Sequence, residues 1–502
     1  MSVSNVSANV SPLLQSVLNL DNQLNDLQRQ LGTGQKADSY AGLGSQGGIA
    51  IAMNAQLAAL SSYNDTITSV GTTVALQQSV LQQIASVGST VQASTVQQGN
   101  FAIDGTGQTT VQKTAQDQLN QIVSALNSQG GNGYLFSGSA LNQPAVDTTD
   151  HILNGNGAQA GLKQVIAERN QADLGADGLG RLVIPAASGS TVAVSEDAAN
   201  SPFGLKLSGV SSSLTGATVT GPAGSPAAIS VALGASNPNS GDSITYTFAL
   251  PDGTSQTLQL TATTSTTPGA NQFTIGATPA ATAANLQAAL TAGVSQIGST
   301  SLSAASAVAA SNNFFDDPPQ RVSGSPATAT ALVDGTPANT VFWYTGNDGP
   351  GSARSSATAR IDASTTVSYG TQANEQGIRW IVQNVATLAA TTYSTSDPNA
   401  AASYSALSNR VYSALSIPPG TQKIDDIEAS LANAQTAMAN AKTQHQQTSA
   451  TLSDMLQSIE GVDTTTVGEQ ILSLQTSLSA SLSTTARMSQ LNLLNYLSPV
   501  TG

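Results

Sequence analysis

Cysteine is absent from this 502-residue sequence. Its absence excludes disulfides, thiolate nucleophiles, zinc fingers and iron–sulfur clusters together. It fits a protein of the reducing cytosol, and it fits equally a chain that crosses a narrow export channel unfolded. No run approaches eighteen apolar residues, so no bilayer-spanning helix is predicted. No basic residue precedes Arg29 and the early apolar residues are spaced, which argues against a cleavable secretory signal.

Charge is also scarce. Charged residues make up 9% of the chain, against about 25% in ordinary globular proteins. Fifteen basic residues against 29 acidic ones leave a net charge of -14, and no two basic residues lie closer than six positions apart. These values argue against nucleic acid as a partner and make the chain a poor candidate for binding an anionic membrane surface. Apolar residues still reach 39%, which argues against a wholly disordered polyelectrolyte.

The N-terminal segment carries one narrow apolar stripe, with steps of four and three residues that are typical of a coiled-coil helix. Ser11 as a cap with Pro12 at the first helical position predicts one start, although an earlier start stays open, and Gly32 and Gly34 predict the end. The stripe consists of Leu13, Val17, Leu20, Leu24, Leu27 and Leu31.

A second helical tract follows a glycine-rich joint and runs to about residue 98. Asn64, Gly71 and Gln78 interrupt its apolar stripe. A continuous helix of this length cannot bury itself in one compact domain, so it predicts a rod. A third, shorter helix carries Ala115, Leu119, Ile122 and Leu126.

The middle of the chain, about 140–365, is rich in Thr, Ser, Gly, Ala and Pro. Alternating runs at Ile244–Leu250 and Thr257–Ala262, joined by a Pro-Asp-Gly-Thr turn, predict a β-hairpin. Ala280–Leu290 predicts a helix packed on that sheet.

Helical patterns return at about residue 373 and continue at Tyr404–Leu415 and Ile424–Ile459, with Pro418 and Pro419 between these two. Thr466 and Glu469 form an expected capping box for the last helix. The fold class is therefore α+β, with long terminal helices forming a coiled-coil rod and an inserted β-rich outer domain. The last helix carries apolar residues at Val467, Ile471, Leu474, Leu478, Met488, Leu491, Leu494, Tyr496 and Leu497.

Both terminal stripes predict an assembly interface. Burying six Leu or Val side chains contributes on the order of 10 kcal/mol before entropy is subtracted. A lone helix such as 13–31 is marginal in water. We therefore expect the two terminal helices to pair with each other and with neighbouring copies, and to order on assembly.

Four short segments near the two ends of the chain carry recognisable motifs: Leu31–Lys36, Gly131–Gly138, Ile459–Asp463 and Ala486–Leu497. These segments resemble the bacterial flagellin family, which includes hook-associated relatives of the filament subunits. The resemblance covers about residues 1–140 and 370–502. The sequence departs from the family where a Lys/Arg-Asn-x-x-Asp-Asp-Pro run is replaced by Lys36–Tyr40 and glycines.

This resemblance implies a non-enzymatic structural subunit of the flagellum that joins hook to filament, with a filament flagellin as the alternative. It implies export without a cleaved signal and an extracellular location. The implied partners are copies of itself, other hook-associated proteins and flagellin, and it allows for an export chaperone. The expected parts are an inner helix (1–40), a helical rod (41–175), a β-rich outer domain (176–365), a second rod segment (366–462) and a C-terminal inner helix (463–502).

Other chemistry is weighed against simpler interpretations. Gly42–Gly47 matches G-x-G-x-x-G, but a dinucleotide site needs a preceding strand, and a helix is expected there. His445 is interpreted as solvated surface, and His151 as a surface loop rather than a metal site. No cofactor or metal is expected. Two alternative functions stay open. The β-rich middle region allows a secreted adhesin or glycan-binding protein, and His151 allows an enzyme.

The acidic and aromatic clusters are also interpreted as structural features. The acidic residues Asp425, Asp426 and Glu428 are interpreted as a helix start, where negative charge meets the helix dipole. Asp316 and Asp317 precede two prolines and indicate a turn. The aromatic residues Phe314, Trp343 and Tyr344 are interpreted as core rather than as carbohydrate-stacking residues.

Overall fold

A computed structural model describes residues 4–96, 101–131, 133–347 and 349–496. The chain is divided into two compact units, each built from separate stretches of sequence. The first unit takes its described residues from Met1–Thr68, Arg360–Thr366 and Thr436–Gly502. The second takes them from Ser69–Ala359 and Val367–Gln435. The α+β class is confirmed, with long helices at both ends and a β-rich middle.

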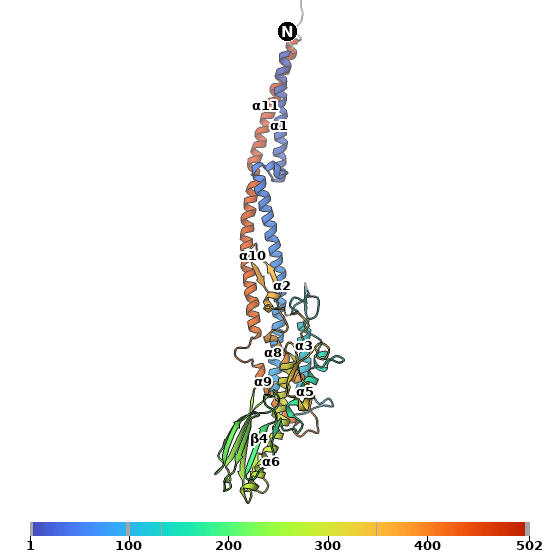
Figure 1. The fold of residues 1–502 in the computed structure, drawn as a ribbon. Helices are drawn as coiled ribbons and strands as arrows, with labels where there is room; N and C mark the ends of the chain where they lie inside the picture. Colours follow the sequence, from blue (N-terminus) through green and yellow to red (C-terminus); the bar gives the residue numbers. More distant parts are fainter. Residues whose placement is uncertain (1–3, 97–100, 132, 348, 497–502) are drawn as a thin grey trace, which may run out of the picture. The chain divides into compact units, whose positions relative to one another are not determined.

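The first unit is helical (Figure 1). In it, α1 (Ser4–Thr33) lies beside α11 (Thr464–Tyr496). Of the two starts left open for the first helix, the one at Ser11 and Pro12 is wrong and the earlier one holds, because α1 begins by Ser4 and Pro12 lies inside it. The expected end is confirmed: Gly34 has φ +71 and its N–H bonds to the Gln30 carbonyl at 2.8 Å. That bond satisfies a carbonyl that the helix end would otherwise leave free.

Two further long helices contribute segments to both units. The predicted second tract is α2 (Gly47–Val96), preceded by the 3-10 helix η1 (Tyr40–Gln46). The predicted tract after the two prolines is α10 (Ile424–Glu460). Within the part of the chain that the structure describes, no helix is long and apolar enough to cross a membrane.

The second unit contains a helical part and a sheet part. The third predicted helix is α3 (Thr110–Leu126), and the four apolar residues by which it was predicted are all buried. It packs on α8 (Gln376–Ala390). At this contact the fully buried Gln112 donates hydrogen bonds from Nε2 to the carbonyls of Leu388 at 3.2 Å and Thr391 at 2.7 Å. The other helices are α4 (Thr149–Asn154), α5 (Leu162–Leu174), α6 (Pro279–Ile297), η2 (Gly298–Leu302), α7 (Ser303–Phe314), η3 (Pro326–Thr328), η4 (Ala353–Ser356) and α9 (Ala400–Leu415).

Sequence reasoning missed α7. This helix is rich in Ala and Ser and is buried on most of its surface. A helix that is buried all round has no polar face, so it lacks the periodicity by which an amphipathic helix is recognised.

Two four-stranded sheets share one core with α6. The predicted hairpin is confirmed: β8 (Ser243–Ala249) pairs antiparallel with β9 (Ser255–Thr263). The core contains Tyr246 and Phe248 from β8 and Leu286 and Leu290 from α6. The strand orders are β10-β9-β8-β5 and β3-β4-β7-β6. The remaining strands of these sheets are β3 (Leu182–Val183), β4 (Thr191–Glu196), β5 (Lys206–Ser212), β6 (Thr218–Ala223), β7 (Ala228–Ala232) and β10 (Gln272–Thr274).

Three short two-stranded pairs complete the described strands. They are β1 (Gln129–Gly130) with β2 (Gly133–Tyr134), β11 (Gln320–Val322) with β12 (Leu332–Asp334), and β13 (Thr358–Arg360) with β14 (Thr366–Ser368).

Candidate functional site: the terminal helices and their joint

The predicted stripe of α1 faces α11 but is only half-buried. Val17, Leu20, Leu24 and Leu27 are each half-buried, and Leu31 is 43% exposed. Two helices alone cannot cover a coiled-coil seam from all sides, so part of each side chain stays accessible. The side chain of Leu13 lies outside the described residues.

The stripe of α11 is best covered near its N-terminus. Val467 and Ile471 are buried, Leu474 and Leu478 are half-buried, and Met488 is 45% exposed. The side chains of Leu491, Leu494 and Tyr496, and all of Leu497, lie outside the described residues.

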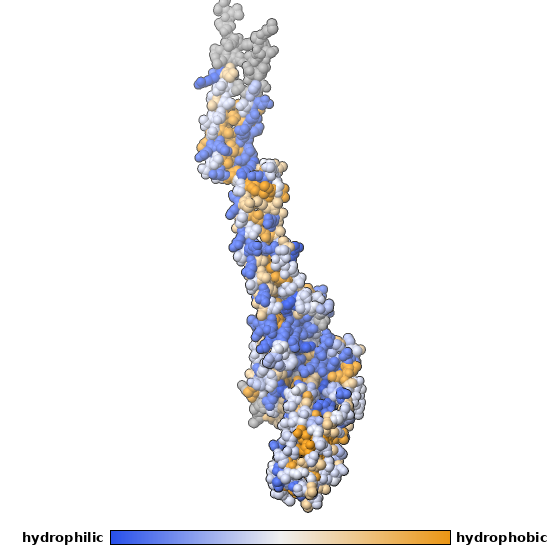
Figure 2. Space-filling view, turned by 60° about the vertical axis from the view of Figure 1, so that its left-hand side comes forward, coloured by the Kyte–Doolittle hydropathy of each residue, from blue (hydrophilic) through white to orange (hydrophobic). Residues whose placement is uncertain are grey.

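A second apolar set lies beside the predicted stripes and was not singled out from the sequence. Leu14 and Leu18 on α1 are 58% and 55% exposed, and Leu472 and Leu482 on α11 are 66% and 50% exposed. Leu14, Leu18 and Leu472 each directly follow a stripe residue, and Leu482 lies four positions after Leu478. The sequence therefore already shows a second apolar residue beside several stripe positions. Figure 2 shows hydrophobic side chains at the surface along these helices. The terminal pair therefore presents more apolar surface than one partner helix can cover.

The turn after α1 meets the turn before α11 through main-chain atoms. Gln35 and Gly461 form an antiparallel bridge. Around it, the Lys36 N–H donates to the Glu460 carbonyl at 2.7 Å, and the Val462 N–H donates to the Gly34 carbonyl at 3.1 Å. We call these residues, 34–36 and 460–462, the joint. Two segments that resemble the flagellin family, far apart in sequence, therefore lie together.

Side chains reinforce the joint. Lys36 Nζ donates to the Ser458 carbonyl at 2.7 Å. Arg29 pairs with Asp38 at 2.6 Å and with Asp26. The hydrogen bond to Asp26, with the nearby charge of Asp38, raises the pKa of Arg29 above its ordinary value. These contacts tie the last turn of α1 to the chain that leaves it.

Asp463, rather than Thr466, caps the last helix. Asp463 Oδ1 accepts hydrogen bonds from the N–H groups of Thr465 at 2.9 Å and Thr466 at 3.4 Å. These bonds lower the pKa of Asp463. The expected capping box of Thr466 and Glu469 is wrong, because the helix already begins at Thr464. A carboxylate is a strong acceptor for free N–H groups, so Asp463 takes the cap position ahead of Thr466, which lies three residues later.

His445 is buried, which overturns its interpretation as solvated surface. Its side chain is 2% exposed. Its Nδ1 lies 3.1 Å from Asn64 Oδ1, and its ring packs near Tyr63 with 5.9 Å between the centroids. His445 lies in a polar run, but it is seven residues, about two helical turns, after the buried Met438. That spacing is the signal that would have placed His445 on the inner face of α10.

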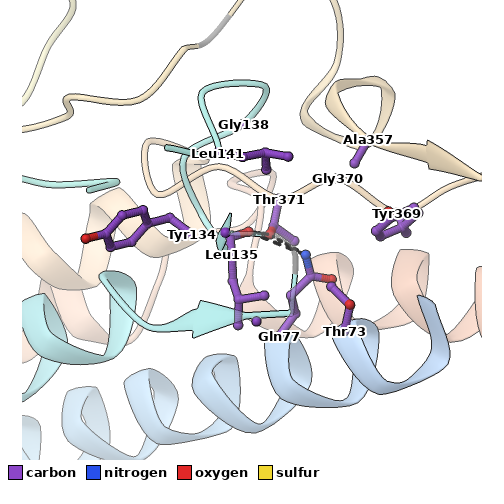
Figure 3. Close-up of a pocket in the computed structure, with 12 residues that line it drawn as sticks. Thr73, Gln77, Tyr134, Leu135, Gly138, Leu141, Ala357, Tyr369, Gly370 and Thr371 are labelled. Atoms are coloured by element: carbon purple, nitrogen blue, oxygen red, sulfur yellow. Dashed lines mark hydrogen bonds between the residues drawn. The ribbon is translucent and has the colours of Figure 1, made fainter. Parts of the chain in front are cut away.

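Gln77 links α2 to a motif segment in the second unit. Its side chain is 2% exposed. Its Nε2 donates to Thr371 Oγ1 at 2.8 Å and to the Leu135 carbonyl at 3.4 Å. These groups border a cavity of about 70 Å³ (Figure 3). The cavity also borders Gly133 and Gly138, which belong to the segment that resembles the family. Asn132 of that segment lies outside the described residues.

The remaining candidate residues have structural partners. His151 lies on the short helix α4 with its Nδ1 2.9 Å from Asp147 Oδ1. Asp425 and Asp426 lie in the first turn of α10, as interpreted from the sequence, and Asp426 accepts from the Lys423 N–H at 2.8 Å. Among the described residues, no three or more His, Asp or Glu side chains gather as they would to hold a metal ion.

The aromatic residues are core, as the sequence analysis favoured. Phe314 is fully buried and Trp343 is 3% exposed, so neither offers a face for stacking on a sugar. Phe315 lies between them, with ring centroids 5.2 Å from Phe314 and 5.1 Å from Trp343. Tyr344 is half-buried beside Trp343. This cluster lies at the end of α7.

The glycine-rich motif lies between two helices. Gly42–Gly47 covers the end of η1 and the first residue of α2, and the preceding regular element is α1 rather than a strand. Gly44 has φ +61, a conformation that side chains with a Cβ rarely adopt. The motif is therefore a helix-to-helix connection.

Residues 5–140 match the family model of the bacterial flagellin N-terminal helical region. This match supports the flagellin family. It runs from α1 to the chain just after β2 and includes the first half of the joint. No curated protein matches the chain. A match to this region of flagellin supports a structural role in the bacterial flagellum, an extracellular appendage built from polymerised subunits.

Proposed function

We propose that the chain is a structural subunit of the bacterial flagellum that joins hook to filament, corresponding to hook-associated protein 3. The observation that carries the flagellar part is the match of residues 5–140 to the flagellin N-terminal helical region. The junction role is supported by the segments Gly131–Gly138 and Ala486–Leu497, which resemble that protein more than a filament flagellin.

The mechanism is polymerisation coupled to folding. A chain with no cysteine passes an export channel without cross-linking. The half-buried stripe of α1 and the exposed Leu14, Leu18 and Leu472 lose water when neighbouring copies pack on them. Each fully buried leucine adds roughly 2 kcal/mol of favourable transfer. The assembly interface is therefore the predicted set from Leu13 to Leu31 and from Val467 to Leu497.

The proposal includes the other parts expected from the sequence. Residues 1–40 and 463–502 form the inner helices, 41–175 and 366–462 the rod, and 176–365 the outer domain. The partners are further copies, other hook-associated proteins and flagellin, with an export chaperone before secretion. Export proceeds without a cleaved signal, and the subunit acts without enzymatic activity, cofactor or metal.

Gene deletion in the bacterium that carries the chain tests the junction role. We expect cells with hooks but no filaments, and flagellin shed into the medium. Filaments that still form on clean hooks would refute the junction assignment. Complementation with the unaltered gene is the control.

Immunolabelling of intact flagella separates the junction protein from a filament flagellin. A junction protein stains one short band beside the hook. A filament flagellin stains the whole length, and it dominates the protein of sheared flagella.

A further inference from the structure

Two Asn-Gly pairs follow each other directly at the end of α4, at Asn154–Gly155 and Asn156–Gly157. In an Asn-Gly pair the main-chain nitrogen of the glycine can attack the side-chain carbonyl of the asparagine. Glycine allows this attack more readily than other residues, because it has no Cβ to obstruct the approach. The two pairs have the same sequence, so a difference in their reactivity arises from the structure around them.

The first pair is held by hydrogen bonds on both reacting groups. Asn154 Nδ2 donates to Asp150 Oδ1 at 2.6 Å, and Asn154 Oδ1 accepts from Lys163 Nζ at 2.8 Å. A carboxylate only accepts hydrogen bonds and an ammonium group only donates them, so these two partners fix which way the amide is turned. The N–H of Gly155 donates to the His151 carbonyl at 2.9 Å. The attacking nitrogen and the side chain that it would attack are therefore both occupied.

The second pair lacks these restraints. Asn156 and Gly157 are both exposed, in a turn that two main-chain hydrogen bonds close. The Asn156 N–H donates to the Gln159 carbonyl and the Gln159 N–H donates to the Asn156 carbonyl, each at 3.0 Å. Within the described residues, neither the Asn156 side chain nor the Gly157 N–H makes a hydrogen bond. The attacking nitrogen and the side-chain carbonyl of this pair are therefore both free to react.

We propose that Asn156 is a site of spontaneous deamidation and that the hydrogen bonds around Asn154 protect it from the same reaction. The Gly157 nitrogen bonds to Asn156 Cγ and loses its proton, and the side-chain nitrogen leaves as ammonia. Water then opens the resulting succinimide ring at either of its carbonyls, which gives aspartate or isoaspartate without oxidation or reduction. Either product adds one negative charge to the turn. The proposal rests on the geometry of the second unit and does not depend on the flagellar assignment.

The isoaspartate product also changes the backbone. Its main chain runs through the former side-chain carbon, so the path from residue 156 to Gly157 becomes one carbon longer. The turn leads directly into a pairing with another segment: the Ala160 N–H donates to the Asn339 carbonyl at 2.9 Å, and the Val341 N–H donates to the Ala160 carbonyl at 3.0 Å. Because the reaction needs only water, the modified fraction grows with the age of the chain.

Mass spectrometry of the full chain tests the site. The folded protein is kept at mildly alkaline pH in water enriched in heavy oxygen, then digested and fragmented so that residue 154 is read separately from residue 156. We expect acid that carries heavy oxygen to accumulate at Asn156 many-fold faster than at Asn154, and isoaspartyl methyltransferase to label part of it. In the chain unfolded by urea, the two pairs should react at similar rates. Equal rates in the folded chain, or the same difference in urea, would overturn the proposal.

Substitutions assign the protection to its hydrogen bonds. Asp150→Ala combined with Lys163→Ala removes both partners of the Asn154 side chain, so deamidation at Asn154 should rise several-fold while deamidation at Asn156 stays unchanged. Gln164→Ala, at an exposed position beside Lys163, is the matched control and should change neither rate. Asn156→Gln should abolish the reaction at its position, because attack on the longer side chain must close a larger ring. Protection of Asn154 that survives the double substitution contradicts the role given to these hydrogen bonds.

Discussion

At the scale of single residues, polar side chains within apolar stripes make the specific contacts between helices. Asn64 and Gln78 interrupt the stripe of α2, and each meets a polar partner on α10: Asn64 contacts His445, and Gln78 accepts from Gln435 Nε2 at 3.0 Å. Such pairs fix which turn of one helix lies against which turn of the other, because shifting the register leaves them without partners.

Gln112 provides a stability test at this scale. Gln112→Ala removes an amide that is fully buried and donates to Leu388 and Thr391. The carbonyl groups left behind lose their donor, so we expect the free energy of unfolding to fall by roughly 2 kcal/mol. Guanidinium unfolding followed by circular dichroism measures it. The exposed Asn120→Ala on the same helix is the control, and equal losses in the two variants would contradict the prediction.

Asp463 provides a pH test. Its pKa is lowered in the folded chain by the N–H groups of Thr465 and Thr466. The stability that Asp463 contributes to the folded chain is therefore fully present above the pKa of an unfolded aspartate. It is lost as the pH falls through the lowered pKa of the folded state. Asp463→Ala is expected to lower the helix content of α11 at neutral pH, and this difference from the unaltered chain should shrink in acid. Circular dichroism across pH measures it, with the exposed Asp454→Ala as control.

His445 and Asp463 lie in stretches where several polar residues could take one role. For His445, the seven-residue spacing from Met438 indicates the inner face of α10 but not its partner Asn64. For Asp463, the choice of cap depends on where the helix begins. The caps and buried polar residues are therefore less predictable than apolar stripes, whose members all have the same preference for burial.

At the scale of elements, the apolar repeats made the long helices predictable. The stripe of α2 and the spacing of four and three in α1 and α11 each predict a helix, and the structure has them. The Pro-Asp-Gly-Thr turn predicted the β8–β9 hairpin, because Pro and Gly suit its backbone. The predicted start of α1 at Ser11 and Pro12 was wrong. Pro12 suits a first helical position, but the chain before it is also helical.

Leu24 provides the assembly test at this scale. It is half-buried in the single chain, so Leu24→Ala should change the melting temperature of the monomer little. If neighbouring copies cover the part of Leu24 that stays accessible, the concentration that Leu24→Ala needs for polymerisation should rise several-fold. Light scattering and negative-stain microscopy measure polymerisation. Gln23→Ala, at an exposed position of the same helix, is the control. Identical polymerisation of the two variants would contradict a role for the stripe in assembly.

At the scale of the whole molecule, the two units differ in how they bury apolar residues. The sheets and α6 of the second unit enclose a continuous core that includes Tyr246, Phe248 and Leu286. The terminal helices of the first unit leave Leu18 and Leu472 more than half exposed. The second unit thus contains a continuous buried core, whereas the terminal helices of the first leave these leucines accessible.

Hydrogen exchange tests this difference. We expect amides of α1 and α11 to exchange quickly in the monomer and to become protected by orders of magnitude in the polymer, because packing removes local opening. Amides of β8 and β9 should exchange slowly in both states and serve as the internal reference. Strong protection of α1 in the dilute monomer would contradict the idea that its order depends on assembly.

The joint has a consequence for how such chains vary. Its bridge is made by main-chain atoms of residues 34–36 and 460–462. Hydrogen bonds of this kind use no side-chain atoms, and proline at Lys36 or Val462 would delete a donor. Two positions nevertheless favour glycine: Gly34 has φ +71, and a Cβ at Gly461 would lie 2.5 Å from the Gln457 carbonyl oxygen. Homologous chains can therefore vary in sequence at residues 35, 36, 460 and 462 while keeping the same connection, provided that both glycines remain. Structural comparison will then identify relatives that sequence comparison overlooks.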